Sequence, residues 1–440
     1  MLDNLKEIAL FQKEYIDDIE CIRNTNIENL QEFQYKKIKD VVGYAYANSE
    51  FYKNRFSNID LNSFDMKTFE SLPYTTKEDL ANFKNDILSK DINECAYYYE
   101  TTGTTGPATP CPRGYWDTFV NAANVSGVWE KIFGDTKPVI ALMGPNEIHS
   151  FVDTVSFACL LNKYCVFKVW PISPVVGFDK AVQLIKDYKI DTLVCTPGMA
   201  MRIYKYVIDN SMTIKDNFNI KTLIFTGEMM TEGLCRNISS LYNNALVLNG
   251  LYGSQEGFVM GAAGKNGEMY TFPNSYYYDM ISVFKCPEKE YKELVLTMYH
   301  KDAKPLIKFR TGDLVQLGEY EENGKQKIKV IGRLKDVIYI NGVPYCPFEI
   351  EEMVFKHITK CTGYKIELSD NNGDYLKLYL QFEKGNVICS SQINKIEEYI
   401  SNILNIKVEV CIDRSMSDDI LIGAMYGWKA ARFKDLRNNA

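Results

Sequence analysis

The sequence predicts an α/β protein, with a large N-terminal domain of parallel and mixed sheets with helices and a small α+β C-terminal domain. Three observations predict this fold class. At 440 residues the chain is too long for one typical core. Between residues 138 and 250, short apolar runs alternate with amphipathic stretches, which is typical of buried parallel strands alternating with helices. From residue 332 on, about a hundred residues carry apolar periodicities of their own. We therefore expect domains at 1–331 and 332–440.

The N-terminal region is predicted to be helical over residues 27–56. Its apolar side chains recur at three- and four-residue spacing, at Leu30, Phe33, Ile38, Val41, Val42 and Ala45. Farther along, Thr75 and Glu78 have the spacing of a capping box, which predicts that a short helix begins there.

The central region is predicted to form a largely parallel sheet. The apolar runs read as strands are 139–143, 164–169, 192–195, 222–225 and 245–248, and residues 179–188 have the pattern of an amphipathic helix. Ligands bind off the carboxyl ends of such strands. Two strand ends carry polar clusters, at 226–228 and 249–256, so a nucleotide could bind there.

The remaining elements follow in two groups. Residues 293–299, 305–309, 314–317 and 327–331 are predicted to be antiparallel strands. The small domain is expected to contain a strand at 337–340, an Asn341-Gly342 turn, a helix beginning near Pro347, a strand pair around 370–374, a helix over 393–403 and a strand at 406–411.

Composition excludes several classes of function. The 46% apolar and 24% charged content is that of a soluble globular protein, and a net charge of −7 argues against nucleic-acid binding. No apolar run approaches the roughly 18 residues of a membrane span, and the N-terminus does not read as a signal peptide. We therefore expect a cytoplasmic protein. Its twelve scattered cysteines are expected to be buried free thiols, not a disulfide or zinc framework, and its three histidines leave little choice for a histidine base.

The segment 99–107 has the composition of a phosphate-binding loop. Two glycines stand among four threonines, at Thr101, Thr102, Gly103, Thr104, Thr105 and Gly106, with no acidic side chain between them. Glycine lets the backbone approach a ligand closely, so that N–H groups and hydroxyls can face an anion. It is not a Walker loop, because Pro107 stands where that pattern needs a lysine. An ordinary flexible turn remains the alternative.

Two carboxylates later in the chain could complete such a site. Glu256 follows a strand and a turn, and a carboxylate there could hold Mg²⁺ shared with phosphates. Asp313, in Arg-Thr-Gly-Asp, could bind both ribose hydroxyls. The alternatives are a solvated turn for Glu256 and a turn-capping role for Asp313.

The order of the motifs resembles a known superfamily. Thr-Thr-Gly-Thr-Thr-Gly, Tyr252-Gly-Ser-Gln-Glu, Arg310-Thr-Gly-Asp-Leu and Gly332-Arg-Leu-Lys-Asp, in that order, resemble the core motifs of the adenylate-forming enzymes, which are the acyl-CoA synthetases, luciferases and nonribosomal peptide adenylation domains. Within it, the segments 44–52, 72–80, 191–197 and 223–228 resemble the phenylacetate–CoA ligase group. The resemblance runs from about residue 25 to the C-terminus.

The resemblance implies a role for each matching residue. The loop Thr101–Gly106 would hold the ATP phosphates and Glu256 the magnesium. The remaining nucleotide contacts would come from Gly227, Glu228, Tyr252, Gly253, Ser254, Asp313 and Arg333, and Asp313 with Arg333 would hold the ribose. Lys335 matches the hinge about which the small domain reorients. His149 and Gly250 would lie near the acyl group, although a structural histidine explains His149 equally well.

The family's last functional element is a lysine near the C-terminus. The tail beginning at Gly427 resembles the group's closing Gly-Lys-Ala-x-Arg segment, which makes Lys429 the candidate. Because Trp428 separates the glycine from the lysine, Lys434 is a rival, and a solvated basic tail is the alternative to both. Some relatives carry Cys and His after the Glu256 motif, but residues 257–280 have neither, so no zinc is expected.

The function implied is ATP- and Mg²⁺-dependent activation of a carboxylic acid, aromatic by analogy with the subgroup, followed by transfer to the thiol of CoA. Transfer to the phosphopantetheine of an acyl carrier protein, or to an amine, is the first alternative. A non-catalytic nucleotide-binding homologue is the second. The sequence names neither the acid nor the acceptor, and it leaves a homodimer open.

Overall fold

The computed structural model describes residues 2–23, 27–101, 108–287, 289–321, 323–370, 373–383, 388–413 and 432–437. The chain divides into two compact units. The first unit contains residues 1–132, 146–162 and 252–330, and the second contains 133–145, 163–251 and 331–440. This division is not the one expected from sequence, 1–331 and 332–440, and the two expected domains stay a prediction.

The first unit begins with helices. They are α1 (Leu2–Arg23), α2 (Ile27–Asn48), α3 (Glu50–Arg55), η1 (Leu61–Ser63), α4 (Met66–Ser71), α5 (Lys77–Phe83), η2 (Ile92–Glu94), α6 (Tyr115–Phe133) and α7 (Ser150–Leu161). The predicted helix near 27–56 is present as α2 and α3. The expected cap was wrong by one residue, because the capping box of α5 joins Thr76 and Asp79. Thr75 instead donates its hydroxyl to the carbonyl of Ile307 at 2.8 Å.

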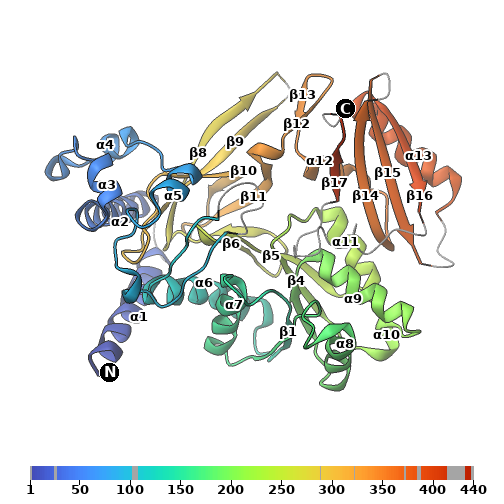
Figure 1. Ribbon diagram of the computed structural model, residues 1–440, viewed down its shortest axis with the longest axis horizontal. Helices are drawn as coiled ribbons and strands as arrows, with labels where there is room; N and C mark the ends of the chain where they lie inside the picture. Colours follow the sequence, from blue (N-terminus) through green and yellow to red (C-terminus); the bar gives the residue numbers. More distant parts are fainter. Residues whose placement is uncertain are drawn as a thin grey trace. The chain divides into compact units, whose positions relative to one another are not determined.

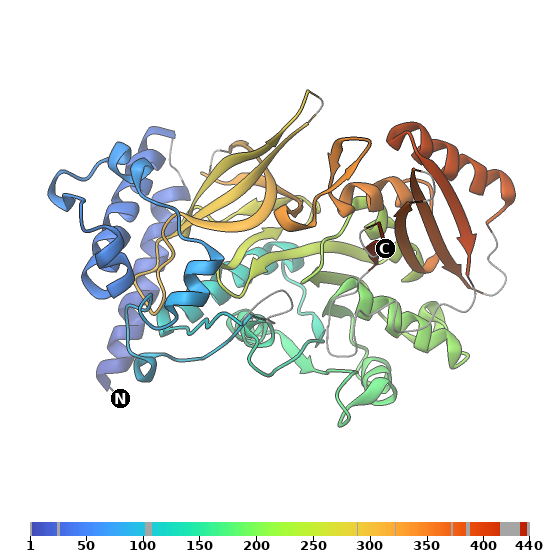
Figure 2. The same ribbon diagram turned by 45° about the horizontal axis from the view of Figure 1, so that its top comes forward.

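The first unit also contains a sheet with the strand order β6-β7-β11-β10-β9-β8. Its strands are β6 (Phe258–Ala263), β7 (Met269–Thr271), β8 (Tyr276–Lys285), β9 (Glu290–Met298), β10 (Phe309–Tyr320) and β11 (Gln326–Arg333). Strands β8 and β9 pair antiparallel over their whole length and form a long twisted ribbon, yellow in Figure 2. The prediction of a strand over 305–309 was wrong. Lys308 has a φ of +48°, outside the strand region, and β10 begins only at Phe309.

The second unit contains a parallel sheet in the order β2-β1-β3-β4-β5. Its elements are β1 (Val139–Leu142), β2 (Cys165–Lys168), α8 (Gly177–Asp187), β3 (Thr192–Cys195), α9 (Pro197–Asp209), α10 (Ile214–Asn217), β4 (Thr222–Thr226), α11 (Glu232–Leu241) and β5 (Leu246–Ser254). The last three residues of β5 belong to the first unit. All five predicted strands are present. β3 and β4 are buried at every position, as expected for central parallel strands, whereas β2 is exposed at both ends.

The C-terminal part of the second unit is α+β, as expected. Its elements are η3 (Leu334–Asp336), β12 (Ile338–Ile340), β13 (Val343–Tyr345), α12 (Pro347–Phe355), β14 (Cys361–Asp370), β15 (Asp374–Phe382), α13 (Ser390–Leu404), β16 (Lys407–Ile412) and β17 (Phe433–Asp435). The order β16-β15-β14-β17 makes one sheet, with α13 beside it (Figure 1). Asn341 and Gly342 both have positive φ, +49° and +78°, as a two-residue hairpin turn requires.

Two expectations about the chain as a whole can be compared with the structure. All twelve cysteines lie in the described residues and are free, but only five of them are buried, and Cys21, Cys165 and Cys389 are exposed, so the expected burial was wrong for most of them. Among the described residues, no helix combines the length and apolarity needed to cross a membrane.

Candidate nucleotide and metal site

The stem of the predicted phosphate loop is a short two-stranded hairpin in the first unit. The amide of Thr101 donates to the carbonyl of Thr109 at 3.1 Å, and the amide of Thr109 donates to the Thr101 hydroxyl at 2.8 Å. Below this closing pair, the amide of Cys111 donates to the Tyr99 carbonyl at 2.8 Å. The other predicted loop residues, Thr102, Gly103, Thr104, Thr105 and Gly106, lie outside the described residues.

Tyr252 and Asp313 of the first unit meet directly. The Tyr252 hydroxyl donates to Asp313 Oδ2 at 2.8 Å, across 61 residues of sequence. Both side chains are buried, and the amide of Asp313 donates to the Thr311 hydroxyl at 3.1 Å. The carboxylate is therefore held in a fixed orientation. Two motifs that the sequence treats separately form one group.

Glu293 of β9 holds the backbone turn that carries Asp313, and the sequence analysis missed it. One of its oxygens accepts from Arg310 Nε at 3.0 Å and Nη2 at 2.5 Å, and the other accepts from the Gly312 amide at 2.9 Å. The pairing of β9 and β10 shifts register between Arg310 and Leu314 at this point. Gly312 has a φ of +72°, which glycine tolerates. Nothing local in the sequence marks Glu293, because its partners lie on another strand.

Glu256 lies in the turn after β5 and fits a magnesium ligand. The turn is tight: Gly257 donates its amide to the Ser254 hydroxyl at 2.9 Å, and a Cβ at Gly253 would lie 2.3 Å from the Phe258 carbonyl oxygen. Glu256 is only 6% exposed, yet no hydrogen bond to its carboxylate is present in the described part of the chain. A mostly buried carboxylate with open oxygens suits a hard cation shared with phosphates. The same described ranges contain no group of three His, Cys, Asp or Glu side chains placed to hold a metal by themselves.

Arg113 connects the loop stem to this turn, a link that the sequence analysis also missed. Its guanidinium donates to the Gln255 carbonyl at 2.6 Å and lies 3.2 Å from the ring centre of Phe258. Gln255 in turn accepts from the Ser150 hydroxyl at 2.6 Å. The stem and the Glu256 turn therefore have a fixed separation within the first unit.

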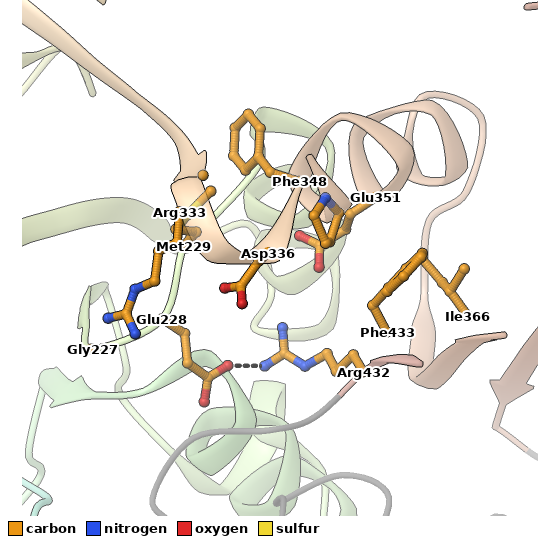
Figure 3. A pocket seen from close by; sticks show the side chains of 12 residues that line it. Gly227, Glu228, Met229, Arg333, Asp336, Phe348, Glu351, Ile366, Arg432 and Phe433 are labelled. Atoms are coloured by element: carbon orange, nitrogen blue, oxygen red, sulfur yellow. Dashed lines mark hydrogen bonds and ion pairs between the residues drawn. The ribbon is translucent and has the colours of Figure 1, made fainter. Parts of the chain in front are cut away.

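A cavity of about 280 Å³ in the second unit gathers the other predicted nucleotide contacts (Figure 3). Gly227 and Glu228 line it from the turn after β4, and Arg333 lines it from the segment before η3. Arg432 reaches the same cavity and forms a buried ion pair with Glu228. Sequence had not singled out Arg432, because its partner lies 204 residues away.

The electrostatics of this cavity centre on Arg432. Burial alone would lower its pKa, but Glu228, Tyr364 and Glu351 together raise the pKa above the ordinary arginine value. Arg432 donates to the Tyr364 hydroxyl at 2.9 Å, and that hydroxyl donates to Glu351 at 2.5 Å. Burial raises the pKa of the Glu351 carboxyl. The cavity wall thus carries both a permanent cation and a carboxyl whose pKa is raised by burial.

The remaining predicted residues are spread over both units. His149 caps α7, its Nδ1 accepting from the Phe151 amide at 3.4 Å. Gly250 of β5 fits tightly, since a Cβ there would lie 2.1 Å from Ile224 Cγ2. Lys335 lies in η3, and exposed Lys434 lies in β17 opposite Glu367. Lys429 lies outside the described residues.

The predicted nucleotide- and metal-binding residues thus fall into two groups, one in each unit. Thr101, Tyr252 and its turn, Glu256 and Asp313 belong to the first unit, and Gly227, Glu228 and Arg333 belong to the second. The ribose pair of Asp313 and Arg333 draws on both units and stays a prediction. The hinge role of Lys335 and the acyl-group roles of His149 and Gly250 also stay predictions.

The chain is similar to known ligases over most of its length. No family model matches the chain. The chain is 25% identical to a phenylacetate–coenzyme A ligase of Pseudomonas putida, covering 89% of this chain and 93% of that protein. It is 22% identical to the phenylacetate–coenzyme A ligase of Escherichia coli, over 96% and 98% of the two chains.

Solved structures give the same result for the fold. A crystal structure of 2-hydroxyisobutyryl-CoA ligase, in the postadenylation state with an acyl-AMP, superimposes with a TM-score of 0.78 at 16% identity. The match covers 94% of this chain and 91% of that one. The α/β fold with its α+β C-terminal part is therefore the adenylate-forming fold. The chain is similar to phenylacetate–coenzyme A ligases over nearly its whole length and has the fold of an adenylate-forming CoA ligase.

Proposed function

We propose that the protein is an AMP-forming acid–thiol ligase that activates a carboxylic acid with ATP and transfers the acyl group to CoA. The observation that carries this proposal is the Tyr252–Asp313 group beside the Glu256 turn, because it combines an oriented carboxylate with an open carboxylate in one unit. Phenylacetate–coenzyme A ligases that match over nearly the whole chain support the same reaction.

The first step needs charge compensation more than proton transfer. A carboxylate oxygen of the acid attacks the α-phosphorus of ATP, and the bond to pyrophosphate breaks, which leaves acyl-AMP. Two anions must approach each other, so fixed positive groups and N–H donors stabilise the transition state. Glu256 would hold Mg²⁺, which supplies part of that positive charge. Asp313 would orient the ribose. In the second step the thiol attacks the acyl carbonyl and AMP leaves.

The terminal lysine provides a direct test of the first step. Lys429→Ala is expected to lower acid-dependent ATP–pyrophosphate exchange by at least about 10²-fold, as loss of one fixed transition-state donor does. Lys434→Ala is the matched control, since Lys434 is exposed in β17 and its loss should leave exchange near wild type. Near-normal exchange in Lys429→Ala together with a large loss in Lys434→Ala would assign the role to Lys434. Near-normal exchange in both variants would assign it to neither lysine.

The substrate and acceptor need one combined experiment. ATP–pyrophosphate exchange measured over a panel of aromatic and aliphatic acids tests adenylation, and the same panel with CoA, an acyl carrier protein or a free amine tests the acceptor. We expect exchange with an aromatic acid and thioester formation with CoA. Exchange without CoA-ester formation would favour the carrier protein or the amine, and no exchange with any acid would favour a non-catalytic homologue.

Four further expectations belong to the same proposal. We expect a cytoplasmic enzyme, acting on a small-molecule acid and without a nucleic-acid partner. A homodimer remains an open expectation, which the molecular mass in solution would decide.

A further inference from the structure

Arg113 is a buried arginine whose side chain holds the turn that carries Glu256. Only 2% of Arg113 is exposed. Its Nη2 donates to the Gln255 carbonyl at 2.6 Å, and its guanidinium carbon lies 3.2 Å from the ring centre of Phe258. Gln255 directly precedes Glu256, and Phe258 follows it by two residues. The guanidinium therefore contacts the turn on both sides of the predicted magnesium ligand.

The guanidinium of Arg113 has little else to bind. Its Nε and Nη1 are buried and have no hydrogen-bond partner among the described residues. Burial lowers the pKa of this guanidinium, which reflects the cost of keeping the charge out of water. Arginine is seldom fully buried unless it is paired, and a local rule broken in this way is expected mainly at functional sites. The cost therefore points to a role for Arg113 at the Glu256 turn.

Both ends of the contact between Arg113 and Gln255 are anchored. The Arg113 amide donates to the Tyr97 carbonyl at 2.8 Å, and the Arg113 carbonyl accepts from the Ala96 amide at 2.7 Å. On the other side, Gln255 Oε1 accepts from the Ser150 hydroxyl at 2.6 Å, at the start of α7. Gln255 is thus held by its main chain and by its side chain.

Glu256 itself depends on this turn for its position. The residue is only 6% exposed, and its carboxylate has no hydrogen bond within the described ranges. No side-chain contact of its own therefore orients the carboxylate. Groups that orient a metal ligand from behind commonly change metal affinity by about 10- to 100-fold when they are removed.

We propose that Arg113 is a positioning residue for Mg²⁺-dependent nucleotide binding: it fixes the main chain at Gln255, so that Glu256 is in place before the metal arrives. Arg113 acts through the turn and does not touch the metal. This rests on the proposed function, since it takes Glu256 as the magnesium ligand. It predicts that Arg113 affects the part of the ATP affinity that depends on Mg²⁺ and leaves the rest unchanged.

Arg55 offers a matched control in the same unit. Its Nη2 also donates to a backbone carbonyl, that of Tyr74 at 2.5 Å, and its guanidinium also lies over an aromatic ring, 5.1 Å from the centre of Phe51. Arg55 also forms an ion pair with Asp79 at 3.4 Å. None of these partners belongs to the Glu256 turn. Replacing Arg55 therefore reports the loss of a packed arginine without releasing that turn.

The experiment measures the dissociation constant of ATP for the full-length protein without any acid, once with excess Mg²⁺ and once with EDTA, together with the melting temperature. The ratio of the two constants is the magnesium enhancement. We expect Arg113→Met to lower this enhancement about tenfold and to change ATP affinity in EDTA by less than about twofold. Arg55→Met should lower the melting temperature but keep the enhancement within about twofold of wild type.

A double-mutant cycle separates positioning from general stability. Glu256→Gln should lower the enhancement strongly, and adding Arg113→Met to it should change the enhancement little further, because both act through the same carboxylate. If Arg113→Met does not fold, Arg113→Lys replaces it. Lysine cannot keep both the carbonyl bond and the stacking, so we expect the enhancement to fall at least about threefold.

The contrary outcomes are equally distinct. An unchanged enhancement in the Arg113 variant, equal losses with Mg²⁺ and with EDTA, or the same loss in Arg55→Met would overturn the role and leave a purely structural arginine. If Glu256→Gln lowers the enhancement and the Arg113 variant does not, this inference alone fails. If the wild type binds ATP equally with Mg²⁺ and with EDTA, or binds no ATP, the proposed function fails with it.

Discussion

The hydrogen bond from Tyr252 to Asp313 is the single-residue contact on which the nucleotide site depends most directly. Tyr252→Phe removes the only donor of that side chain and leaves a buried carboxylate with one partner fewer. We expect a stability loss of about 1–3 kcal/mol and a several-fold rise in the KM for ATP, measured by thermal denaturation and by exchange kinetics. Tyr270→Phe is the control, because its hydroxyl binds Glu268 at 2.9 Å on the exposed surface. An unchanged KM in Tyr252→Phe would argue against Asp313 as the ribose ligand.

Glu351 gives a pH-dependent prediction at the same scale. Its folded-state pKa is raised from the ordinary 4.5, so the folded protein binds a proton more readily than the unfolded chain. The Glu351 carboxyl therefore stabilises the folded state at pH values below its unfolded-state pKa. This stabilisation is lost as the pH rises through the raised folded-state pKa. We expect Glu351→Gln to melt at a higher temperature than wild type near neutral pH, and the gain to disappear below about pH 4.

The control for that prediction is the neighbouring carboxylate of the same helix. Glu349 accepts the Cys346 amide at 2.8 Å and so caps α12. Glu349→Gln should therefore lower the melting temperature and show no comparable gain at neutral pH. A Glu351→Gln variant that melts below wild type at pH 7 would contradict a raised pKa for this carboxyl.

At the scale of elements, the contact of β4 with β5 depends on a missing side chain. A Cβ at Gly250 would lie 2.1 Å from Ile224 Cγ2, closer than any ordinary contact. We expect Gly250→Ala to cost about 1–3 kcal/mol of unfolding free energy, because the strands must separate or Ile224 must leave its position. Denaturant unfolding measures this cost.

Gly43→Ala is the matched control for the same substitution. Gly43 lies inside α2 with nothing within 4 Å of an added Cβ. Alanine is the better helix former, so we expect a gain of up to about 1 kcal/mol there. A Gly250→Ala variant as stable as wild type would show that the sheet absorbs the methyl group.

At the scale of the whole molecule, the predicted reorientation of residues 332–440 can be tested at Lys335. Lys335→Pro restricts φ at the predicted hinge in η3 while leaving the nucleotide contacts in place. We expect thioester formation from acyl-AMP to slow at least about tenfold, with ATP–pyrophosphate exchange within about threefold of wild type. Lys335→Ala, which keeps the backbone free, should affect neither step strongly. Equal losses in both steps of Lys335→Pro would place the hinge elsewhere.

Local patterns in the sequence were sufficient for most elements. The runs that became β1, β3 and β4 are recognisable because strands buried on both faces are continuously apolar. The Asn341-Gly342 hairpin is recognisable because its turn needs two residues that tolerate positive φ. The motifs around Glu256 and Asp313 were found for a similar reason, since glycine turns that present a carboxylate leave a short signature.

The partners of those motifs were decided only by the tertiary structure. Arg113 meets Gln255 across 142 residues, and Lys304 meets Pro110 across 194. No periodicity encodes such pairs, because each lies on an element whose local pattern is satisfied without the contact. The sequence by itself determined that a glycine- and threonine-rich loop and two carboxylate turns exist. The tertiary structure decided which cation holds the Glu256 turn and which donor orients Asp313, since burial and hydrogen-bond geometry arise only when distant segments pack.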